Sequence, residues 1–342
     1  MTQHISAVLL ILCTGPLAGA GQNAPLKSVP SEIKELAYEV SDVRYIETSG
    51  GVPGLTFAHG LEVGSDIFVI DAQNPKPRKL ISGGAAPAWS PDGSELAYCT
   101  WKGAGLGQLE VANADGTGRR QITNMKGGAC YPDWSPDGTK IVFTALSIGA
   151  SEKNLTDATI NHLAIFAVDK NGGDAVPIAP GFAARWSPGG TMLVILRGAD
   201  KKGPAHSVWL ATADGKQSKM LVASDSRMKG AAWLPDGKGI AVSYMRDGKY
   251  SIFRIYLDGS QSQGNQPKRI GGDARADWYE PSLSADGKHL IAIKDCGANH
   301  WEPYSNTDTV CRGSAIVLLD IDTNKDVTLA SGFNYSVVWE RK

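Results

Sequence analysis

Four histidines of the chain could ligate a metal ion if folding brought their imidazoles together. They are His59, His162, His206 and His300, and each lies at or near the end of a segment with the composition of a loop. No two of them have the i, i+4 spacing that places two ligands on one face of a helix. We therefore expect solvated or loop-packing histidines and no cofactor, with a metal site as the alternative.

A second group of residues could bind a partner. Aromatic side chains with a polar edge suit either a sugar platform or the centre of a protein interface, and charged neighbours can orient the bound group. The candidate binding residues are Trp101, Tyr131, Asp133, Arg185, Trp278, Tyr279, Glu280, Trp301 and Tyr304. The alternative for each ring is packing inside the fold.

The cysteines predict disulfide bonds. Cys13 lies in the N-terminal leader described below, which leaves Cys99, Cys130, Cys296 and Cys311, an even number. Cys296 and Cys311 flank one loop with 14 residues between them, and closing a loop of this size stabilises a fold by about 3 kcal/mol on the chain-entropy model. The pairing of Cys99 with Cys130 follows only by elimination. A metal site is the alternative, but no C-x-x-C spacing occurs.

The N-terminus and the net charge limit where the chain acts. Residues 1–20 contain an apolar run and then small residues that suit a cleavage site, as in a signal peptide. We therefore expect a periplasmic or secreted protein. No later stretch approaches the roughly 18 apolar residues of a membrane span, so no membrane insertion is expected after cleavage. A net charge of −1 argues against nucleic acid as a partner.

A repeated hairpin is predicted to position these residues. Tracts resembling Trp-Ser-Pro-Asp-Gly begin at Pro87, Pro132, Ala184, Ala231 and Glu280. The tryptophans of the first four tracts follow one another at intervals of 45, 52 and 47 residues. Pro presets φ for a turn and Gly supplies its left-handed position. Each tract therefore predicts a β-hairpin in which Trp fills the core and Asp shapes the turn.

Each repeat predicts four strands. The first hairpin is followed by a variable loop and a second hairpin, as in 108–114 and 119–123, with no helical pattern between them. A period of about 50 residues with four strands is typical of a propeller blade. We predict an all-β fold, a six-bladed β-propeller with four antiparallel strands per blade, labelled a to d in chain order.

The two ends of the chain are expected to share one blade and close the ring. Tyr335–Trp339 has the pattern of an isolated a strand, while Asp66–Asp71 and Arg78–Ser82 have the pattern of c and d strands. Leu55–Ala58 or Val43–Glu47 would supply the b strand. Such pairing removes the exposed edges of a linear array. The predicted organisation is a signal peptide at 1–20, an N-terminal segment at 21–52 that leads into the ring, and a propeller at 53–342.

The up-and-down order of the strands separates two faces. The a–b and c–d turns are short and share one face, whereas the b–c and d–a connections share the opposite face. The longest b–c loops span 146–161, 197–205 and 295–313. Binding residues on a rigid scaffold concentrate on such loops. We call this side the long-loop face and expect the candidate binding residues to lie on it.

The repeated Trp-Ser-Pro-Asp-Gly hairpin, together with hairpins such as Ile165-Phe166-Ala167-Val168-Asp169, resembles the TolB-type propeller family over roughly residues 55–342. TolB belongs to the periplasmic Tol-Pal system and has a globular domain before its propeller. Only about thirty residues separate the signal from the repeats here. The resemblance therefore implies a TolB-like propeller that is not an orthologue of TolB.

The resemblance and the export signal imply a scaffold that binds a protein or cell-envelope partner, expected to act as a monomer. Related propellers include oligogalacturonate lyases that hold a divalent metal through histidines. A carbohydrate-binding protein or a metal-dependent oligouronate lyase is therefore the alternative. No G-x-S-x-G nucleophile motif occurs, so a non-catalytic role is favoured while the question of an enzyme stays open.

Overall fold

The Trp-Ser-Pro-Asp-Gly tracts form the hairpins that the sequence predicts. In the computed structural model, the turn after Trp89 is closed by Ser90 N, which donates to Glu95 O at 2.8 Å, and by Gly93 N, which donates to Ser90 O at 2.9 Å. Gly93 has a φ of 70°, a conformation that glycine adopts without strain. The structure describes residues 35–45, 61–71, 78–102, 105–126, 128–146, 162–198, 206–225, 228–258, 267–273, 275–284, 286–295, 314–331 and 334–339.

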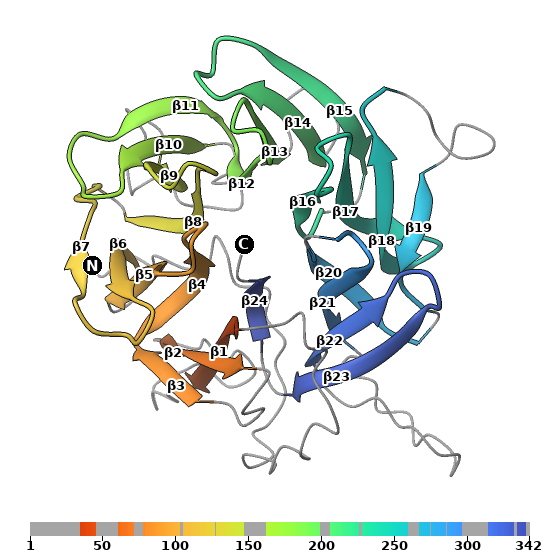
Figure 1. The fold of residues 1–342 in the computed structure, drawn as a ribbon, viewed down its shortest axis with the longest axis horizontal. Helices are drawn as coiled ribbons and strands as arrows, with labels where there is room; N and C mark the ends of the chain where they lie inside the picture. The colour runs from red at the N-terminus through yellow and green to blue at the C-terminus, as the bar shows by residue number, and fades with distance from the viewer. Residues whose placement is uncertain are drawn as a thin grey trace, which may run out of the picture.

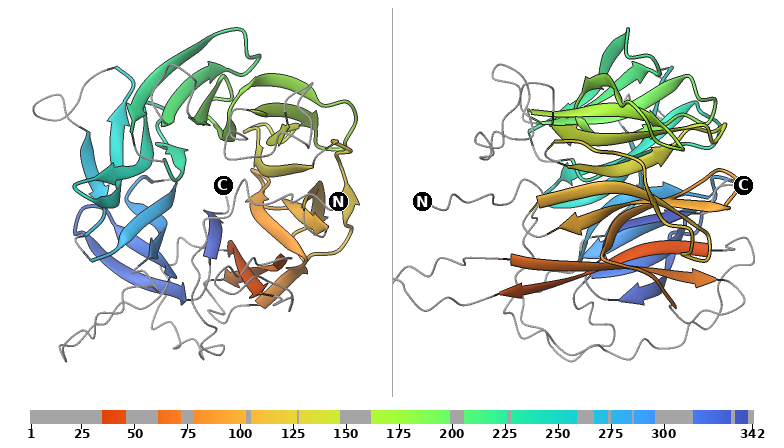
Figure 2. Two further views of the ribbon diagram at one scale, coloured as in Figure 1. Left: turned by 180° about the vertical axis from the view of Figure 1, so that it is seen from behind. Right: turned by 90° about the vertical axis from the view of Figure 1, so that its left-hand side faces the viewer.

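These hairpins assemble into four-stranded antiparallel sheets around a common centre (Figures 1 and 2). Five of the described sheets each use four consecutive strands. The first two contain β4 (Gly84–Trp89), β5 (Glu95–Lys102), β6 (Gly105–Asn113) and β7 (Arg120–Gln121), and then β8 (Ala129–Trp134), β9 (Lys140–Leu146), β10 (Leu163–Asp169) and β11 (Val176–Pro180). The other three contain β12 (Phe182–Trp186), β13 (Met192–Gly198), β14 (His206–Thr212) and β15 (Ser218–Ser224); β16 (Ala231–Trp233), β17 (Gly239–Arg246), β18 (Lys249–Tyr256) and β19 (Lys268–Gly271); and β20 (Asp277–Leu283), β21 (His289–Asp295), β22 (Ser314–Asp320) and β23 (Lys325–Ser331). This confirms the predicted all-β propeller with four-stranded antiparallel blades.

A further sheet joins the two ends of the described chain. Its order is β24 (Asn334–Trp339), β1 (Glu35–Tyr45), β2 (Leu61–Asp71) and β3 (Arg78–Ser82). The three predicted strands of this sheet therefore do meet.

The strand between them differs from the prediction. It is Glu35–Tyr45, which only overlaps Val43–Glu47, and Leu55–Ala58 lies outside the described residues. The stretch 21–52 is thus not merely a lead-in, because residues 35–45 pair with β2 and β24. The physical reason is that β24 and β1 come from opposite ends of the chain. No Trp-Ser-Pro-Asp-Gly turn joins them, so no local signal marks where β1 begins.

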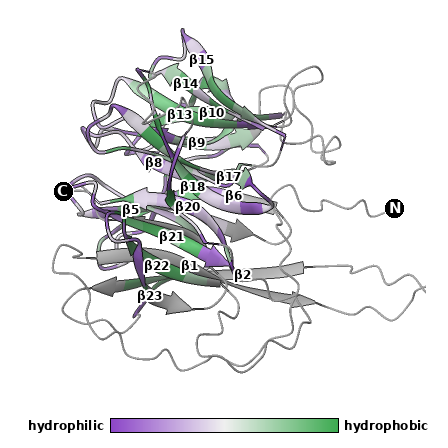
Figure 3. Cartoon of the chain, turned by 90° about the vertical axis from the view of Figure 1, so that its right-hand side faces the viewer, coloured by the Kyte–Doolittle hydropathy of each residue, from purple (hydrophilic) through white to green (hydrophobic). Residues whose placement is uncertain are grey.

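The hydrophobic core lies between neighbouring sheets. The innermost strands β24, β4, β8, β12, β16 and β20 each contact the next, and β20 contacts β24 (Figure 1). One buried cluster combines Ala88 and Val111 from one sheet with Trp134 and Phe143 from the next. Accordingly, hydrophobic residues concentrate in the strands, whereas many of the turns are hydrophilic (Figure 3). Within the described residues, no helix is long and apolar enough to cross a membrane.

A bulge recurs in the inner strands. Four non-glycine residues at one repeat position have left-handed backbones: Ala86 (φ 49°), Tyr131 (φ 57°), Ala183 (φ 50°) and Glu280 (φ 53°). At each of them, two residues of the inner strand oppose one residue of the neighbouring strand. This backbone costs about 1–2 kcal/mol per L-residue, so the surrounding sheet must hold it in place.

The fifth copy of this position is Gly230, with a φ of 102°. A Cβ there would lie 2.9 Å from Glu280 Cα, a contact with backbone that a side chain could not relieve. In this copy of the repeat glycine is therefore required, because β20 approaches the start of β16 closely.

Candidate functional site

The turns opposite the long-loop face are closed by their own side chains. Asp92 Oδ1 accepts hydrogen bonds from Ser90 Oγ at 2.6 Å, Ser94 Oγ at 2.8 Å and Ser94 N at 3.1 Å. Asp137 and Asp286 occupy the same place in their own turns and accept equivalent bonds. These carboxylates therefore shape turns, as the sequence predicts.

The Asp92 turn predicts a specific loss of stability in acid. Hydrogen bonds from the Ser90 hydroxyl, and then from the Ser94 amide and hydroxyl, lower the pKa of Asp92 from 3.8 to about 2. Because the pKa is lower in the folded state, this stabilisation is present above about pH 4 and is lost as the pH falls towards 2. Asp92→Asn should lower the free energy of unfolding by about 1 kcal/mol at pH 7 and by much less at pH 2, measured by urea unfolding.

Asp236→Asn is the matched control for Asp92→Asn. In its turn Leu234 replaces the serine, and the bond found to the Asp236 carboxylate comes from Lys238 N at 2.9 Å. We expect a smaller loss at pH 7 than for Asp92→Asn. A difference between wild type and Asp92→Asn that is the same at pH 7 and pH 2 would contradict the assignment.

Several predicted residues lie outside the described part of the chain. These are His59, Cys296, His300, Trp301, Tyr304 and Cys311. Trp101 lies in β5, His162 directly precedes β10, and His206 begins β14. Where the structure describes the chain, no three His, Cys, Asp or Glu side chains gather as a metal-binding group.

The structure brings Tyr279 and Glu280 together with a lysine that the sequence analysis missed. Lys229 Nζ lies 4.5 Å from the centroid of the Tyr279 ring and 4.4 Å from that of Tyr250. Tyr279 OH donates to Asp295 Oδ2 at 3.0 Å, and Glu280 N donates to Lys229 O at 2.9 Å. Tyr250 lies near the start of β18, Tyr279 near the start of β20 and Asp295 at the end of β21, which are the strand ends on the long-loop face. They form a cation–π and hydrogen-bonded cluster between two blades.

Trp278 belongs to a neighbouring ion cluster. Its side chain is buried, and Lys294 Nζ lies 5.0 Å from the ring centroid. Lys294 also pairs with Asp273 Oδ2 at 3.1 Å and Asp326 Oδ2 at 3.2 Å. Burial lowers the pKa of Lys294, but the hydrogen bonds and charges of the two carboxylates outweigh burial and raise that pKa. Asp273 and Asp326 therefore balance the positive charge of Lys294 within the fold.

Asp133, Arg185 and Tyr131 lie at the opposite side of the ring of inner strands. Asp133 is buried, and its Oδ2 accepts a hydrogen bond from Trp186 N of the next blade at 2.7 Å. The Arg185 carbonyl accepts one from Trp233 Nε1 at 3.0 Å. Tyr131 is half-buried and packs against the core cluster around Trp134. The hydrogen bonds of Asp133 and Arg185 therefore each connect one blade to the next.

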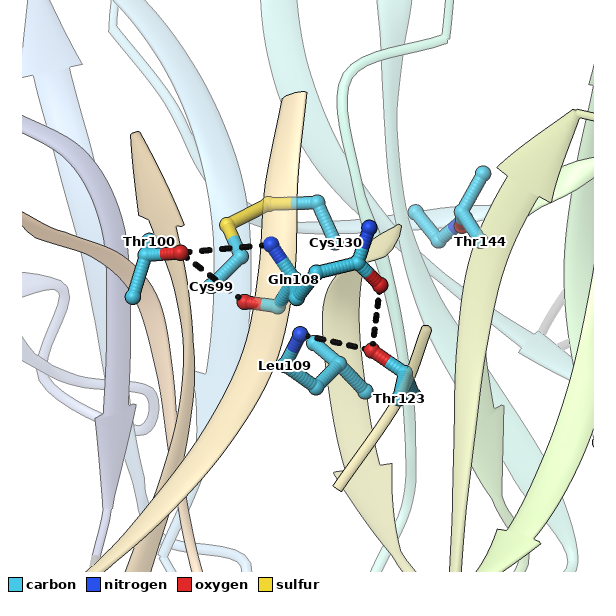
Figure 4. The surroundings of a disulfide bond; sticks show 8 residues. Cys99, Thr100, Gln108, Leu109, Thr123, Cys130 and Thr144 are labelled. Atoms are coloured by element: carbon cyan, nitrogen blue, oxygen red, sulfur yellow. Dashed lines mark hydrogen bonds between the residues drawn. A yellow bond between two sulfur atoms is a disulfide. The ribbon is translucent and has the colours of Figure 1, made fainter. Parts of the chain in front are cut away.

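A disulfide also joins two blades near the long-loop face. Cys99 of β5 is bonded to Cys130 of β8, with the Cα atoms 5.0 Å apart (Figure 4). Beside it, Gln108 Oε1 accepts hydrogen bonds from Thr123 Oγ1 at 2.9 Å and Met125 N at 2.8 Å. The amide and the disulfide together fix the connection between β7 and β8.

The missed residues had different signals in the sequence. Cys130, Lys229 and Tyr279 all directly precede the bulged residue of their repeats, so aligning the repeats would have placed Lys229 with the other two. Arg197 lies at the end of β13 and stacks on Trp209, with its Cζ 3.9 Å from the ring centroid. No repeated pattern marks Arg197, because its contact with Trp209 depends on side chains that only this blade carries on the paired strands β13 and β14.

The comparisons with known proteins agree with this architecture. No protein-family model matches the chain. A stretch of 109 residues, 29% of the chain, is 30% identical to the Tol-Pal system protein TolB of Alkalilimnicola ehrlichii, and the match spans only 25% of that curated relative.

Three solved structures are similar in fold. TolB from Acinetobacter baumannii has a TM-score of 0.65 at 18% identity, over 92% of this chain and 68% of that one. A TolB-type protein from Agrobacterium tumefaciens has a TM-score of 0.61 at 20% identity, over 79% and 90%. An oligogalacturonate lyase in complex with manganese has a TM-score of 0.51 at 13% identity, over 79% and 73%. Identities this low show the fold alone, and the fold of this chain is a β-propeller similar to that of TolB.

Proposed function

We propose that this chain is an exported, periplasmic β-propeller that binds a protein partner through its long-loop face. Residues 1–20 act as the signal peptide. The sheet of β24, β1, β2 and β3 is the sixth blade, in which the two ends of the mature chain close the ring. Pairing the two ends of the chain in one sheet closes the ring without an open end, which gives the rigid platform that a binding surface needs.

One observation carries this proposal, namely the difference between the two faces. On the short-turn side, Asp92 and Asp137 are saturated by hydrogen bonds inside their own turns. On the long-loop face, Lys229 contacts the ring of Tyr250 in its own blade and the ring of Tyr279 in the next blade. Aromatic and cationic side chains supported by a second blade have the composition and rigidity of a protein-binding hot spot.

The likeness to a Tol-Pal system protein supports a periplasmic location and a protein partner. The matched stretch is a quarter of that relative, so its activity is not transferred whole. The proposal therefore commits to a face and to a class of partner. The candidate residues Tyr279 and Glu280 belong to that face, and Trp101 lies near the end of β5 that points to it. Trp301 and Tyr304 are predicted for the same face from the sequence alone.

A pull-down from envelope extract tests the face. The immobilised mature chain should recover a protein partner, and the double variant Lys229→Ala/Tyr279→Ala should recover roughly tenfold less because it loses the central contact. Lys216→Ala/Lys238→Ala is the matched control, since both lysines are exposed on the short-turn side. Equal recovery by both double variants would overturn the choice of face, and no recovery by wild type would overturn the function.

A further inference from the structure

Arg197 is a partly buried cation held in a fixed position between two blades. Its guanidinium stacks on Trp209, with Cζ 3.9 Å from the ring centroid, and its Nε donates to Pro180 O of the neighbouring sheet at 3.0 Å. A Cβ on Gly181 would lie 3.1 Å from Arg197 Cγ, so the stem of the arginine packs closely on that glycine. Stacking and one backbone bond thus orient the guanidinium, and its two terminal nitrogens make no hydrogen bond to the residues that the structure describes.

The Trp209 ring is itself held in place. Its Nε1 donates to Ser207 Oγ at 2.9 Å, and the ring packs against the core cluster that contains Trp186 and Ile195. In the strand register Arg197 is opposite Ser207, so Arg197, Ser207 and Trp209 share one face of the sheet. The ring is therefore a fixed support for the arginine and has no free face for a sugar on the arginine's side.

The charge of Arg197 has no carboxylate partner among the described residues. Arg197 is partly buried, and this burial, which removes part of the hydration of the guanidinium, lowers the pKa of Arg197 from its ordinary value. Lys294 provides the comparison within the same fold: it is also stacked on a tryptophan, but Asp273 and Asp326 neutralise it. A desolvated, stacked guanidinium without an acid is arranged to receive one, because its planar fork matches a carboxylate.

We propose that Arg197 binds a carboxylate of the protein partner at the long-loop face. The inference rests on the proposed function, because it assigns the acidic group to that partner. Arg197 is the second-last residue of β13 and Pro180 is the last residue of β11, so both lie at the edge of the face where the b–c and d–a connections emerge. An acidic side chain entering between these two blades would pair with the terminal nitrogens of the guanidinium.

A model peptide tests the chemistry without the natural partner. Wild-type protein is titrated with acetyl-Gly-Asp-Gly-amide while the NMR signals of Arg197 Nε–H and Trp209 Nε1–H are followed. Both signals should shift in a saturable way, and acetyl-Gly-Asn-Gly-amide should leave them unchanged because it lacks the charge. Arg197→Gln should weaken the peptide roughly 10-fold or more, and Arg197→Lys by less, since it keeps the charge but loses the fork.

Two control variants test whether the peptide binds Arg197 itself or responds only to the charge of the surface. Arg246→Gln removes an exposed cation 5.8 Å from the Phe253 ring centroid and should bind the peptide as wild type does. Asp200→Asn removes a carboxyl group close in sequence and should leave binding unchanged or tighter. The proposal is overturned if the Asp peptide causes no saturable shift of the NMR signals in wild type. It is also overturned if Arg197→Gln binds the Asp peptide as tightly as wild type does. Binding of digalacturonate but not of the peptide also overturns it and assigns the site to an acidic sugar.

The envelope pull-down distinguishes failure here from failure of the proposed function. If wild type recovers a partner and Arg197→Gln recovers roughly tenfold less, the carboxylate contact is supported. If both recover the partner equally, the inference about Arg197 is wrong while the proposed function stands. If wild type recovers no partner but the Asp peptide still binds, the proposed function is wrong and Arg197 is an anion site of another kind.

Discussion

Replacing Cys99 and Cys130 together by alanine is expected to lower the free energy of unfolding by about 3–4 kcal/mol. The bond joins residues 31 apart in sequence, and its loss returns the entropy of that loop to the unfolded chain. It also uncouples two blades, since Cys99 belongs to β5 and Cys130 to β8. Both residues are buried, at 1% and 3% exposure, so alanine is preferred to serine, whose hydroxyl would need a partner.

Urea unfolding of wild type and of the double variant, each with and without dithiothreitol, measures the effect. Wild type in reductant should approach the midpoint of the variant after the protein has unfolded once, because the buried sulfur atoms resist attack in the native state. Any remaining sensitivity of the variant to reductant would report the predicted Cys296–Cys311 bond. A midpoint shared by oxidised wild type and the variant would show that the bond does not stabilise the fold.

The repeated hairpins could be predicted from the sequence because their causes are local. Ser90, Asp92 and Gly93 lie within four residues and are joined by hydrogen bonds. The same short motif therefore gives the same turn in each repeat. Strand β1 could not be found in this way. Glu35–Tyr45 is placed by pairing with β2 and with β24 at the other end of the chain, and no short motif records such pairing.

The candidate site likewise combines residues that the local sequence predicts with residues that only the packing of the blades brings together. Tyr279 and Glu280 were predicted to bind because their residue types and loop position suggested it, and the structure does place them at the long-loop face. Their neighbour Lys229 was missed, since it comes from another blade and meets Tyr279 only when the sheets pack. The left-handed backbone of Glu280 was missed as well, because the bulge arises from the register between β20 and β21.

Replacing Trp134 by alanine is expected to lower the free energy of unfolding by about 3–5 kcal/mol. Trp134 is 1% exposed and fills the core between two sheets, together with Ala88 and Val111 of the preceding blade. Its Nε1 donates to Ala88 O at 3.0 Å, so the side chain contributes both packing and a hydrogen bond across the blade boundary. Urea unfolding followed by circular dichroism measures the loss.

Phenylalanine substitutions separate these two contributions. Trp134→Phe keeps most of the packing but leaves the Ala88 carbonyl without its donor, at a cost of about 1–3 kcal/mol. Trp186 is the matched control, because it fills the same repeat position and its buried Nε1 has no hydrogen-bond partner among the described residues. Trp186→Phe removes an unsatisfied donor and should cost less than Trp134→Phe. Equal losses would mean that packing alone joins the blades and that the bond to Ala88 contributes nothing to the ring.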